Sequence, residues 1–387
     1  MLPVAIVGGG PVGLFLASCL GHFGVQCRVF EQRQTVSGHS RSIGIHPVSL
    51  DLFARLGLSA EFLARGIRVA KGVAFDDRGR VAELSLQACG SNFPFVLIFP
   101  QNETERLLQA HLRSNHPEFF CSESRVVGLT DTGAHVEIES LDFSGRPSSI
   151  QARFVIGCDG KRSLVRQSAG IPFAGGPYPD GFVMGDFDDN TGFGPNAAIF
   201  LHSEGLIESF PLPFQKRRWV IRSDNGTRPL EIPATREEIE SLVSKRIGHD
   251  LHKCRNYMVS RFQAEHFLAP VLYRGRVVLA GDAAHVVSPI GGQGLNLGWL
   301  GAWRLAEQLR EIVQGELPHR LGFARYNRAQ RRAARRATHR AELNMTLGRK
   351  RTRVSLRNSL VRLLLQAPVD RLTARLFTMH GLYSWPI

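Results

Sequence analysis

The chain has 387 residues, 43% of them hydrophobic and 21% charged, with a formal net charge of +14 at pH 7. This length and composition supply a sizeable apolar core and exclude a largely disordered chain. No apolar run is long enough for a membrane-spanning helix, and the chain enters its first strand with no leader before it, so we expect a cytoplasmic protein. Six cysteines without a CxxC pair argue against a disulfide framework and against a metal site, and we predict no metal ion.

The first predicted element is a short buried strand over Val4–Val7, followed at once by a glycine-rich turn. Gly8, Gly10 and Gly13 have GxGxxG spacing. In this pattern the first glycine permits a tight turn, the second leaves room for a pyrophosphate, and the third lets a helix pack close to the strand. The pattern indicates a dinucleotide site, provided that a helix and a second strand follow.

Both elements are predicted in the expected places. A helix over Pro11–Phe23 begins with proline in its first turn, where the missing N–H group costs little. A second strand over Cys27–Phe30 ends at Glu31, close to the offset of about 20 residues at which an acid holds a ribose hydroxyl. The strand, glycines, helix, strand and acid in register predict dinucleotide binding, without separating FAD from NAD(P).

The region up to residue 170 continues as mixed α and β structure. A polar segment over 32–41 is expected to pass near the cofactor, and a strand hairpin is expected over 69–86. The other predicted elements are helices over 47–56, 60–64, 101–112 and 163–169, and strands over 96–99, 123–129, 134–139 and 152–156.

Residues 171–268 differ in character, because short alternating strands are separated by Gly, Pro and Asp clusters. We predict a second, sheet-rich domain here. Its predicted strands cover 182–186, 198–202, 206–210, 219–222 and 259–262, with a helix over 236–245.

A second glycine-rich site follows a buried strand over Arg276–Ala280. Gly281 and Asp282 end that strand, and a loop rich in glycine leads into a long helix from about Leu295. Asp282 can accept a hydrogen bond from a ribitol hydroxyl, and the N–H groups of the helix N-terminus can stabilise negative charge on a flavin ring. The alternative is an ordinary strand–loop–helix turn.

The remainder is predicted to be helical, with breaks near Gly315–Pro318 and Ala367–Pro368. Residues 320–375 contain 16 Lys and Arg against two acids, so the whole charge excess lies in this region. We favour solvated arginine-rich helices, with contact to an anionic membrane as the alternative, and we expect no nucleic-acid partner.

Three motifs, taken together, resemble the FAD-dependent aromatic hydroxylases, the class A flavoprotein monooxygenases of the para-hydroxybenzoate hydroxylase type. The first is the GxGxxG turn with Glu31. The second is the Asp-Gly motif in Cys158–Arg166. The third is Gly281-Asp282 with Ser288–Asn296. Their order and spacing match over residues 1 to about 310, and Gln101 also matches a family position that touches FAD.

This resemblance implies an α/β fold with a Rossmann-like FAD-binding domain, an inserted β-sheet substrate domain and C-terminal helices. The domains would be 1–170 (with part of the substrate sheet near 66–100), 171–268, 269–318 as the return of the FAD-binding domain, and 319–387. Asp159 and Arg166 would stabilise the fold near the pyrophosphate and assist a transient NAD(P)H. The implied cofactor-binding residues are Gly8, Gly10, Pro11, Val12, Gly13, Glu31, Gln32, Arg33, Arg41, Gln101, Asp159, Gly281, Asp282, Pro289, Gly292, Gly294, Leu295 and Asn296.

The implied activity is hydroxylation of an aromatic or quinone-like small molecule with NAD(P)H and O2 through a flavin C4a-hydroperoxide. Pro289 would line the ring near the carbon that reacts with oxygen. His46, His202 and Arg222 are candidates for the substrate pocket with Phe210, because a neutral histidine could take the proton of a phenol. The alternatives are that His46 caps the helix from Pro47 and that His202 faces solvent.

Two other functions stay open. The scaffold also supports flavin-dependent halogenases and reductases, although the Trp-x-Trp-x-Ile-Pro motif of halogenases is missing from the sequence. A non-catalytic, membrane-associated flavoprotein is the third possibility, although storing FAD requires neither the Asp-Gly motif nor the Pro289 loop. The protein is expected to be a monomer or a homodimer.

Overall fold

The computed structural model describes residues 1–36, 38, 42–223, 232–349 and 354–382. The N-terminal apolar run forms β1 (Leu2–Val7), which pairs in parallel with β2 (Cys27–Phe30) on one side and with β11 (Pro147–Gly157) on the other. The sheet runs in the spatial order β17 (Tyr273–Arg274), β18 (Val277–Leu279), β11, β1, β2 and β8 (Phe120–Cys121). The β18–β11–β1–β2–β8 pairings are all parallel, so the carboxyl ends of these strands meet at one edge.

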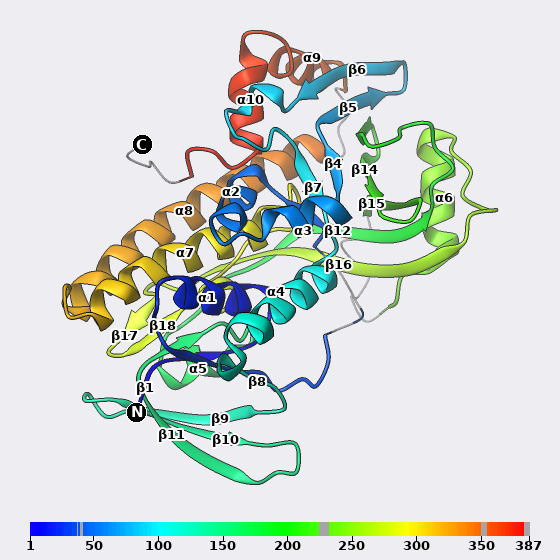
Figure 1. Ribbon diagram of the computed structural model, residues 1–387. Coiled ribbons are helices and arrows are strands. Elements are labelled where there is room, and N and C mark those ends of the chain that lie inside the picture. Colours follow the sequence, from blue (N-terminus) through cyan, green and yellow to red (C-terminus); the bar gives the residue numbers. More distant parts are fainter. Residues whose placement is uncertain (37, 39–41, 224–231, 350–353, 383–387) are drawn as a thin grey trace.

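The long strand β11 also belongs to an antiparallel meander. Its N-terminal half pairs with β10 (Val136–Leu141), which pairs with β9 (Arg125–Asp131). In Figure 1 the meander extends below the parallel sheet, away from the other elements.

Four helices cover the parallel sheet. These are α1 (Pro11–His22), α4 (Gln101–Asn115), α7 (Gln293–Val313) and α8 (His319–Gly348). Helix α1 is apolar around nearly its whole circumference, because it contacts the sheet, α4 and α7 at once. Helices α7 and α8 pack along each other and run together across the left of Figure 1. No described helix is both long and apolar enough to cross a lipid bilayer.

Short elements connect the two main sheets. A small sheet has the order β3 (Gly44–Ile45), β7 (Val96–Ile98) and β4 (Ile67–Val69), and two helices, α2 (Pro47–Arg55) and α3 (Ser59–Arg65), lie between β3 and β4 in the chain. The remaining short helices are α5 (Leu164–Ser168), η1 (Gln87–Cys89), η2 (Pro117–Phe119) and η3 (Gly281–Ala283).

The second main sheet is antiparallel except where β13 meets β5. Its spatial order is β19 (His285–Val286), β16 (Asn256–Leu268), β12 (Ala174–Asp188), β15 (Lys216–Ser223), β14 (Gly205–Leu212), β13 (Ala197–His202), β5 (Lys71–Asp76) and β6 (Gly79–Ser85). One face packs against α6 (Arg236–Ile247) through an apolar cluster that contains Val183, Ile207 and Trp219.

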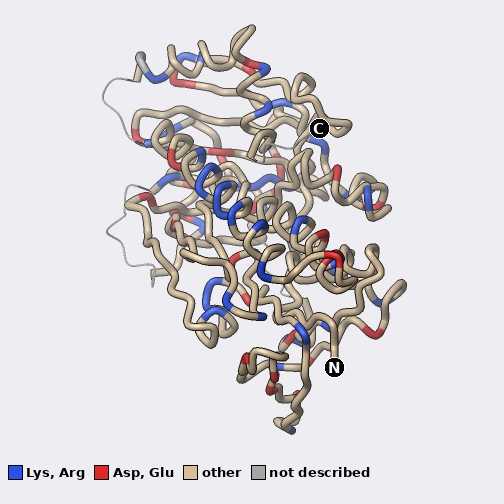
Figure 2. The backbone as a smooth tube through the Cα atoms, turned by 90° about the vertical axis from the view of Figure 1, so that its left-hand side faces the viewer, with Lys and Arg blue, Asp and Glu red and all other residues tan. Residues whose placement is uncertain are grey.

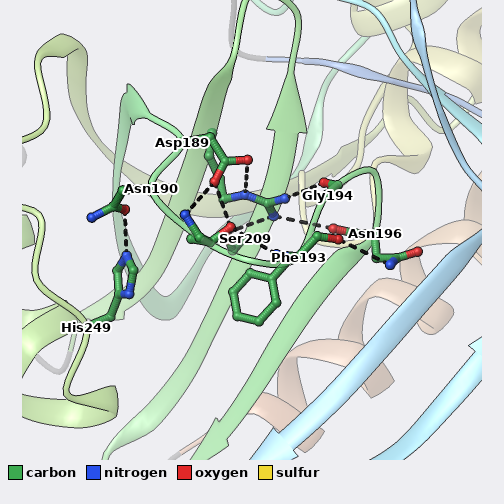
Figure 3. Close-up of polar contacts among 9 residues, drawn as sticks. Asp189, Asn190, Phe193, Gly194, Asn196, Ser209 and His249 are labelled. Carbon is green, nitrogen blue, oxygen red and sulfur yellow. Dashed lines mark hydrogen bonds and ion pairs between the residues drawn. The ribbon is translucent and has the colours of Figure 1, made fainter.

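A buried arginine ties this sheet to the loop before β13. Arg217 is completely buried, and its guanidinium donates to Asp189 Oδ2 at 3.0 Å and to the carbonyl oxygens of Gly194 (2.7 Å) and Asn196 (3.3 Å). Figure 3 shows these partners converging on one point between strand and loop. Because the ion pair is fully hydrogen-bonded, it fixes the loop geometry, and the opposite face of the sheet is left for the cavity described below.

The C-terminal helices close the top of the molecule in Figure 1. Helix α9 (Val354–Leu364) contacts β6, and α10 (Val369–Phe377) contacts η1 and β6. The predicted breaks near 315–318 and 367–368 coincide with the ends of α7 and α9, but the sequence-based expectation missed the end of α8 at Gly348. The strand predicted over 259–262 is also longer, because β16 pairs with β12 along most of its length.

Candidate functional site

The glycine turn after β1 leaves no room for side chains on its protein side. A Cβ on Gly8 (φ +104°) would lie 2.4 Å from the carbonyl oxygen of Cys158, and a Cβ on Gly13 would lie 2.0 Å from that of Gly8. A Cβ on Gly10 would meet nothing within 4 Å. The open space therefore lies at the N-terminus of α1, where free N–H groups and the helix dipole favour a phosphate group.

The carboxylate of Glu31 is hydrogen-bonded to this turn. Its carboxylate accepts the N–H of Gly9 at 2.8 Å and the N–H of Arg33 at 2.8 Å, and only 5% of the residue is exposed. The guanidinium of Arg33 pairs with Glu31 at 3.0 Å and reaches Glu105 at 3.4 Å. Both carboxylate oxygens are thus held at fixed positions at the end of β2, the place at which a ribose hydroxyl is expected.

The start of α4 completes this end of the site. Gln101 Nε2 donates to Glu105 Oε1 at 3.0 Å, and both residues line the cavity beside Arg33. Burial raises the pKa of Glu105, while the hydrogen bond from Gln101 and the charge of Arg33 oppose that rise. Gln32 also lies on the cavity wall, whereas Arg41 lies outside the described residues.

The Asp-Gly motif joins the two glycine-rich sites. Asp159 Oδ2 accepts the N–H of Val165 at 3.0 Å, which fixes the start of α5 after β11, and burial raises the pKa of Asp159. The guanidinium of Arg166 donates to the carbonyl oxygens of Lys161 (2.8 Å) and Ala283 (3.2 Å). Arg166 therefore connects the Asp-Gly loop after β11 to η3, and Asp159 lines the cavity beside it.

The second glycine loop packs on the first through Val12. A Cβ on Gly281 would lie 3.2 Å from Val12, and one on Gly298 would lie 2.7 Å from it, so α7 can approach α1 only because both positions are glycine. Asp282 opens onto the cavity and makes no hydrogen bond or ion pair with any described residue. The protein around it raises its pKa to about 6 by desolvation. A carboxyl with this environment suits a hydroxyl donor on a ligand.

The wall at the start of α7 consists of loop residues. Pro289 is exposed on the cavity side, and Gly292, Gly294 and Leu295 also line it. Asn296, predicted as a cofactor contact, lies behind this wall: it is fully buried and absent from the described cavity lining. Its amide donates to the carbonyl oxygens of Gly44 (2.9 Å) and Gly292 (2.8 Å), so it positions the loop. Gly13 is likewise a packing position.

His46 lies at the cavity wall next to this loop. Its Nε2 donates to the carbonyl oxygen of Gly291 at 3.1 Å, and burial lowers the pKa of the imidazole to about 4. His46 is also the N-cap residue of α2, as the predicted alternative had it, but it caps through its backbone: its carbonyl oxygen accepts the N–H groups of Ser49 (2.9 Å) and Leu50 (3.1 Å), while its side chain makes no capping bond. His46 is thus a neutral imidazole held against the loop that carries Pro289.

His202 and Arg222 are not in the site, which corrects the prediction for both. His202 Nδ1 accepts the N–H of Glu204 at 3.1 Å at the end of β13. Arg222 donates to the buried Asp180 at 3.1 Å, a carboxylate that Arg349 also contacts at 2.7 Å. Neither side chain belongs to the cavity lining within the described residues. Each side chain is hydrogen-bonded to a partner that the alternation of apolar and polar residues in the strand does not reveal.

The cavity has a volume of about 1220 Å³ and runs from the glycine turn to the open face of the second main sheet. It is large enough for a dinucleotide and a small molecule together. Its far part is largely apolar, although Lys71, Glu208 and Arg218 also line the cavity there. The apolar lining residues there are Met184, Ala197, Ile199, Leu201, Leu206, Phe210, Val220 and Phe262 of the sheet and Leu347, Val361, Leu364, Leu365 and Phe377 of the C-terminal helices.

Glu208, a charged residue in this largely apolar part of the cavity, was not identified from the sequence. It lies on β14 between Leu206 and Phe210, and all three line the cavity. Desolvation raises its pKa to about 7. Strand alternation could have found it, because Phe210 was a pocket candidate and residues two apart in a strand share a face.

Comparison with known proteins agrees with this geometry. The family model described as "FAD binding domain" matches residues 1–341. The chain is 33% identical over 319 residues to an uncharacterised aromatic compound monooxygenase of Bacillus subtilis, which covers 81% of this chain and 62% of that protein. It is 29% identical over 325 residues to pentachlorophenol 4-monooxygenase of Sphingobium chlorophenolicum, covering 81% of this chain and 59% of that protein. The chain thus spans about three fifths of the length of these relatives.

Among solved structures, p-nitrophenol 4-monooxygenase from Pseudomonas putida superimposes with a TM-score of 0.89 at 23% identity, over 98% of both chains. At this identity the likeness establishes the fold alone. The shared fold is an α/β FAD-binding domain with an inserted substrate sheet and C-terminal helices, as the sequence motifs predicted.

Proposed function

The chain belongs to the FAD binding domain family, and from this we propose that it is an FAD-dependent monooxygenase that hydroxylates an aromatic or quinone-like small molecule. The observation that carries the proposal is the continuous cavity. It joins a phosphate-binding turn at Gly10 to an apolar chamber on the second sheet. A cofactor held at one end therefore meets a small apolar molecule at the other.

The residues of the turn fit FAD by their chemistry. Gly10 leaves a cradle that any side chain would fill, Glu31 presents a fixed carboxylate for a ribose hydroxyl, and Asp282 presents a carboxyl without a protein partner. FAD, when bound, supplies the redox and oxygen chemistry. The N-terminus of α7 offers N–H groups and a positive field at the wall that contains Pro289 and Gly294, which stabilises negative charge there.

The apolar chamber supplies orientation and excludes water. Packed side chains from β13, β14 and the C-terminal helices surround it, and the low dielectric strengthens every polar contact made inside. The names of relatives, which include pentachlorophenol 4-monooxygenase, support an aromatic substrate. We propose NADH or NADPH as a transient co-substrate and O2 as the oxygen donor.

Two finer points remain predictions. One is the oligomeric state, monomer or homodimer. The other is the role of α8, on which Arg320, Arg325, Arg328, Arg332 and Arg335 are exposed: we favour a solvated helix, with contact to an anionic membrane as the alternative. Figure 2 looks onto this helix and shows its basic residues in a row with few acids among them.

The test is oxygen uptake and NAD(P)H oxidation by purified, FAD-loaded protein, with and without a panel of phenols and quinolones. We expect oxidation that a substrate stimulates and a product heavier by one oxygen atom. A yellow protein that neither NADH nor NADPH reduces under any addition would overturn the proposal and favour a non-catalytic flavoprotein. Chloride-dependent product formation would indicate a halogenase, and reduction of the substrate without oxygen uptake would indicate a reductase.

A further inference from the structure

Glu208 lies in the middle of a largely apolar sheet face, which also carries Arg218. It pairs with Ile199 of β13 on one side and with Val220 of β15 on the other, and both neighbours line the cavity with it. Along its own strand, Leu206 and Phe210 flank it on the same face. A carboxyl at this position contributes nothing to apolar packing, and it costs free energy unless something hydrogen-bonds to it.

No described residue does so. The carboxyl group of Glu208 makes no hydrogen bond or ion pair with any residue in the described part of the chain. The nearest cations on this face by strand register are Arg218 and Arg222 of β15. The guanidinium of Arg218 is bound to Asp186 by hydrogen bonds of 2.7 and 2.8 Å. That of Arg222 is bound to Asp180 at 3.1 Å. The fold thus satisfies both arginines from other residues and leaves the carboxyl of Glu208 open to the cavity.

The raised pKa of Glu208, about 7, agrees with this environment. Near neutral pH both forms of such a carboxyl are populated, and this is the condition under which a side chain accepts and returns a proton efficiently. The rest of the chamber is largely apolar, and the guanidinium of Arg218 is paired with Asp186, so a ligand that fits the chamber carries few polar groups. One hydroxyl on an aromatic ring satisfies both requirements.

We propose that Glu208 receives the hydroxyl of a phenolic substrate and takes its proton. The phenol O–H bond breaks, its electron pair stays on the oxygen and enriches the ring, and a carboxyl O–H bond forms on Glu208. The proton returns to the same oxygen when the attacked ring carbon gives up its hydrogen to water as a proton and the ring becomes aromatic again. This inference rests on the proposed function, because it places the substrate of that reaction.

The binding test compares two ligands, of which only one carries an O–H group that can donate a hydrogen bond. FAD-loaded protein is titrated calorimetrically with 4-nitrophenol and with 4-nitroanisole, its methyl ether, which has no O–H group. We expect the wild type to bind the phenol at least about tenfold more tightly than the ether, and E208Q to bind both alike. E204Q is the matched control, because Glu204 lies on the same hairpin, pairs with Lys245 and is outside the cavity lining. It should keep the wild-type preference.

Two further measurements separate this role from a structural one. The absorbance of bound 4-nitrophenol reports its ionisation, and we expect the phenolate form in the wild type and in E204Q but the phenol form in E208Q. E208L should raise the melting temperature of the protein, since it replaces an unpaired carboxyl by a side chain that suits the apolar face. A lower melting temperature would mean that Glu208 stabilises the fold, and would overturn the proposal.

The proposal is also overturned if the wild type binds both ligands equally or binds neither. A preference for benzylamine that depends on Glu208 overturns it as well, because the carboxylate would then bind a cation and not a phenol. Because these measurements need no turnover, they are independent of the assay above. If phenols bind through Glu208 but are never hydroxylated, the proposed function fails. If phenols are hydroxylated by E208Q as by the wild type, this inference alone fails.

Discussion

The backbone N–H of His46 donates a hydrogen bond of 2.8 Å to Oδ1 of Asn296, a residue 250 positions further along the chain. The bond joins the start of α2 to the first turn of α7. On one side of it lies the imidazole that contacts Gly291, and on the other lies Gly292, whose carbonyl oxygen accepts from the same Asn296 amide. The loop that carries Pro289 is therefore held from two distant parts of the chain.

Replacing Asn296 by alanine should loosen that loop. The variant leaves the N–H of His46 and the carbonyl oxygen of Gly44 buried without their partner, and each such group costs about 1–3 kcal/mol. We expect a loss of about 2–5 kcal/mol in the free energy of unfolding, measured with urea, and at least a tenfold weaker FAD affinity. Asn115→Ala, at the exposed end of α4, is the control. Unchanged FAD affinity in Asn296→Ala would contradict the positioning role.

Gly10 and Gly13 should respond differently to the same substitution. A Cβ on Gly10 meets no protein atom, so the Gly10→Ala apoprotein should unfold within about 0.5 kcal/mol of the wild type while its FAD affinity falls at least tenfold. A Cβ on Gly13 would lie 2.0 Å from a backbone oxygen, so Gly13→Ala should fail to give folded protein. Fluorescence titration with FAD and urea unfolding measure both. Full FAD affinity in Gly10→Ala would place the pyrophosphate elsewhere.

Acid should destabilise the protein through His285. Burial lowers its pKa from 6.5 to about 4, and the amide of Gln330 contacts its Nε2 at 2.7 Å. Between these two values the unfolded chain binds the proton and the folded chain does not, so stability falls as the pH falls through this window. From pH 7 to pH 5 this side chain should cost about 2 kcal/mol.

Urea unfolding at both pH values checks this result in His285→Gln, which should lose about that much less on acidification than the wild type. The exposed His339→Gln is the control and should follow the wild-type pH dependence. If His285→Gln and the wild type lose equal stability between pH 7 and pH 5, the imidazole is not held neutral in the folded protein.

The arginine row of α8 should bind anionic vesicles only at low salt. Most of its apolar residues, such as Phe323 and Ala334, are buried against the rest of the fold, whereas Leu321 and Leu343 are exposed. Attraction to lipid is therefore mainly electrostatic. Such attraction is screened over about 8 Å at physiological ionic strength. We expect co-sedimentation with phosphatidylserine vesicles at about 10 mM salt, where the screening length is about 30 Å, and release near 150 mM, where the screening length falls to about 8 Å. Binding that persists at physiological salt would favour membrane association.

The cofactor end was predictable because its signals are local. Val4–Val7, the three glycines, Pro11 and Glu31 lie within one supersecondary unit, and each position has a single steric or polar reason. The structure has β1, α1 and β2 at those positions, with boundaries within two residues of the prediction at each end.

The substrate end of the cavity could not be predicted from the sequence, because partners far away in the chain determine where its polar side chains lie. The guanidinium of Arg222 could bind an anionic ligand, but it donates to Asp180, which lies 42 positions away in the chain. Arg349 contacts the same carboxylate. His202 ends a strand and turns to its own hairpin. Glu208 was missed for the opposite reason, since only the pairing of β13, β14 and β15 shows that it has no partner.

The far wall of the cavity comes from α9 and α10, which follow every residue of the two glycine-rich loops in the chain. One wall of the chamber is therefore separate in the chain from the glycine-rich loops. Exchange of the segment after Gly348 between related chains would change that wall, and with it the shape of the chamber, without changing any residue of those loops.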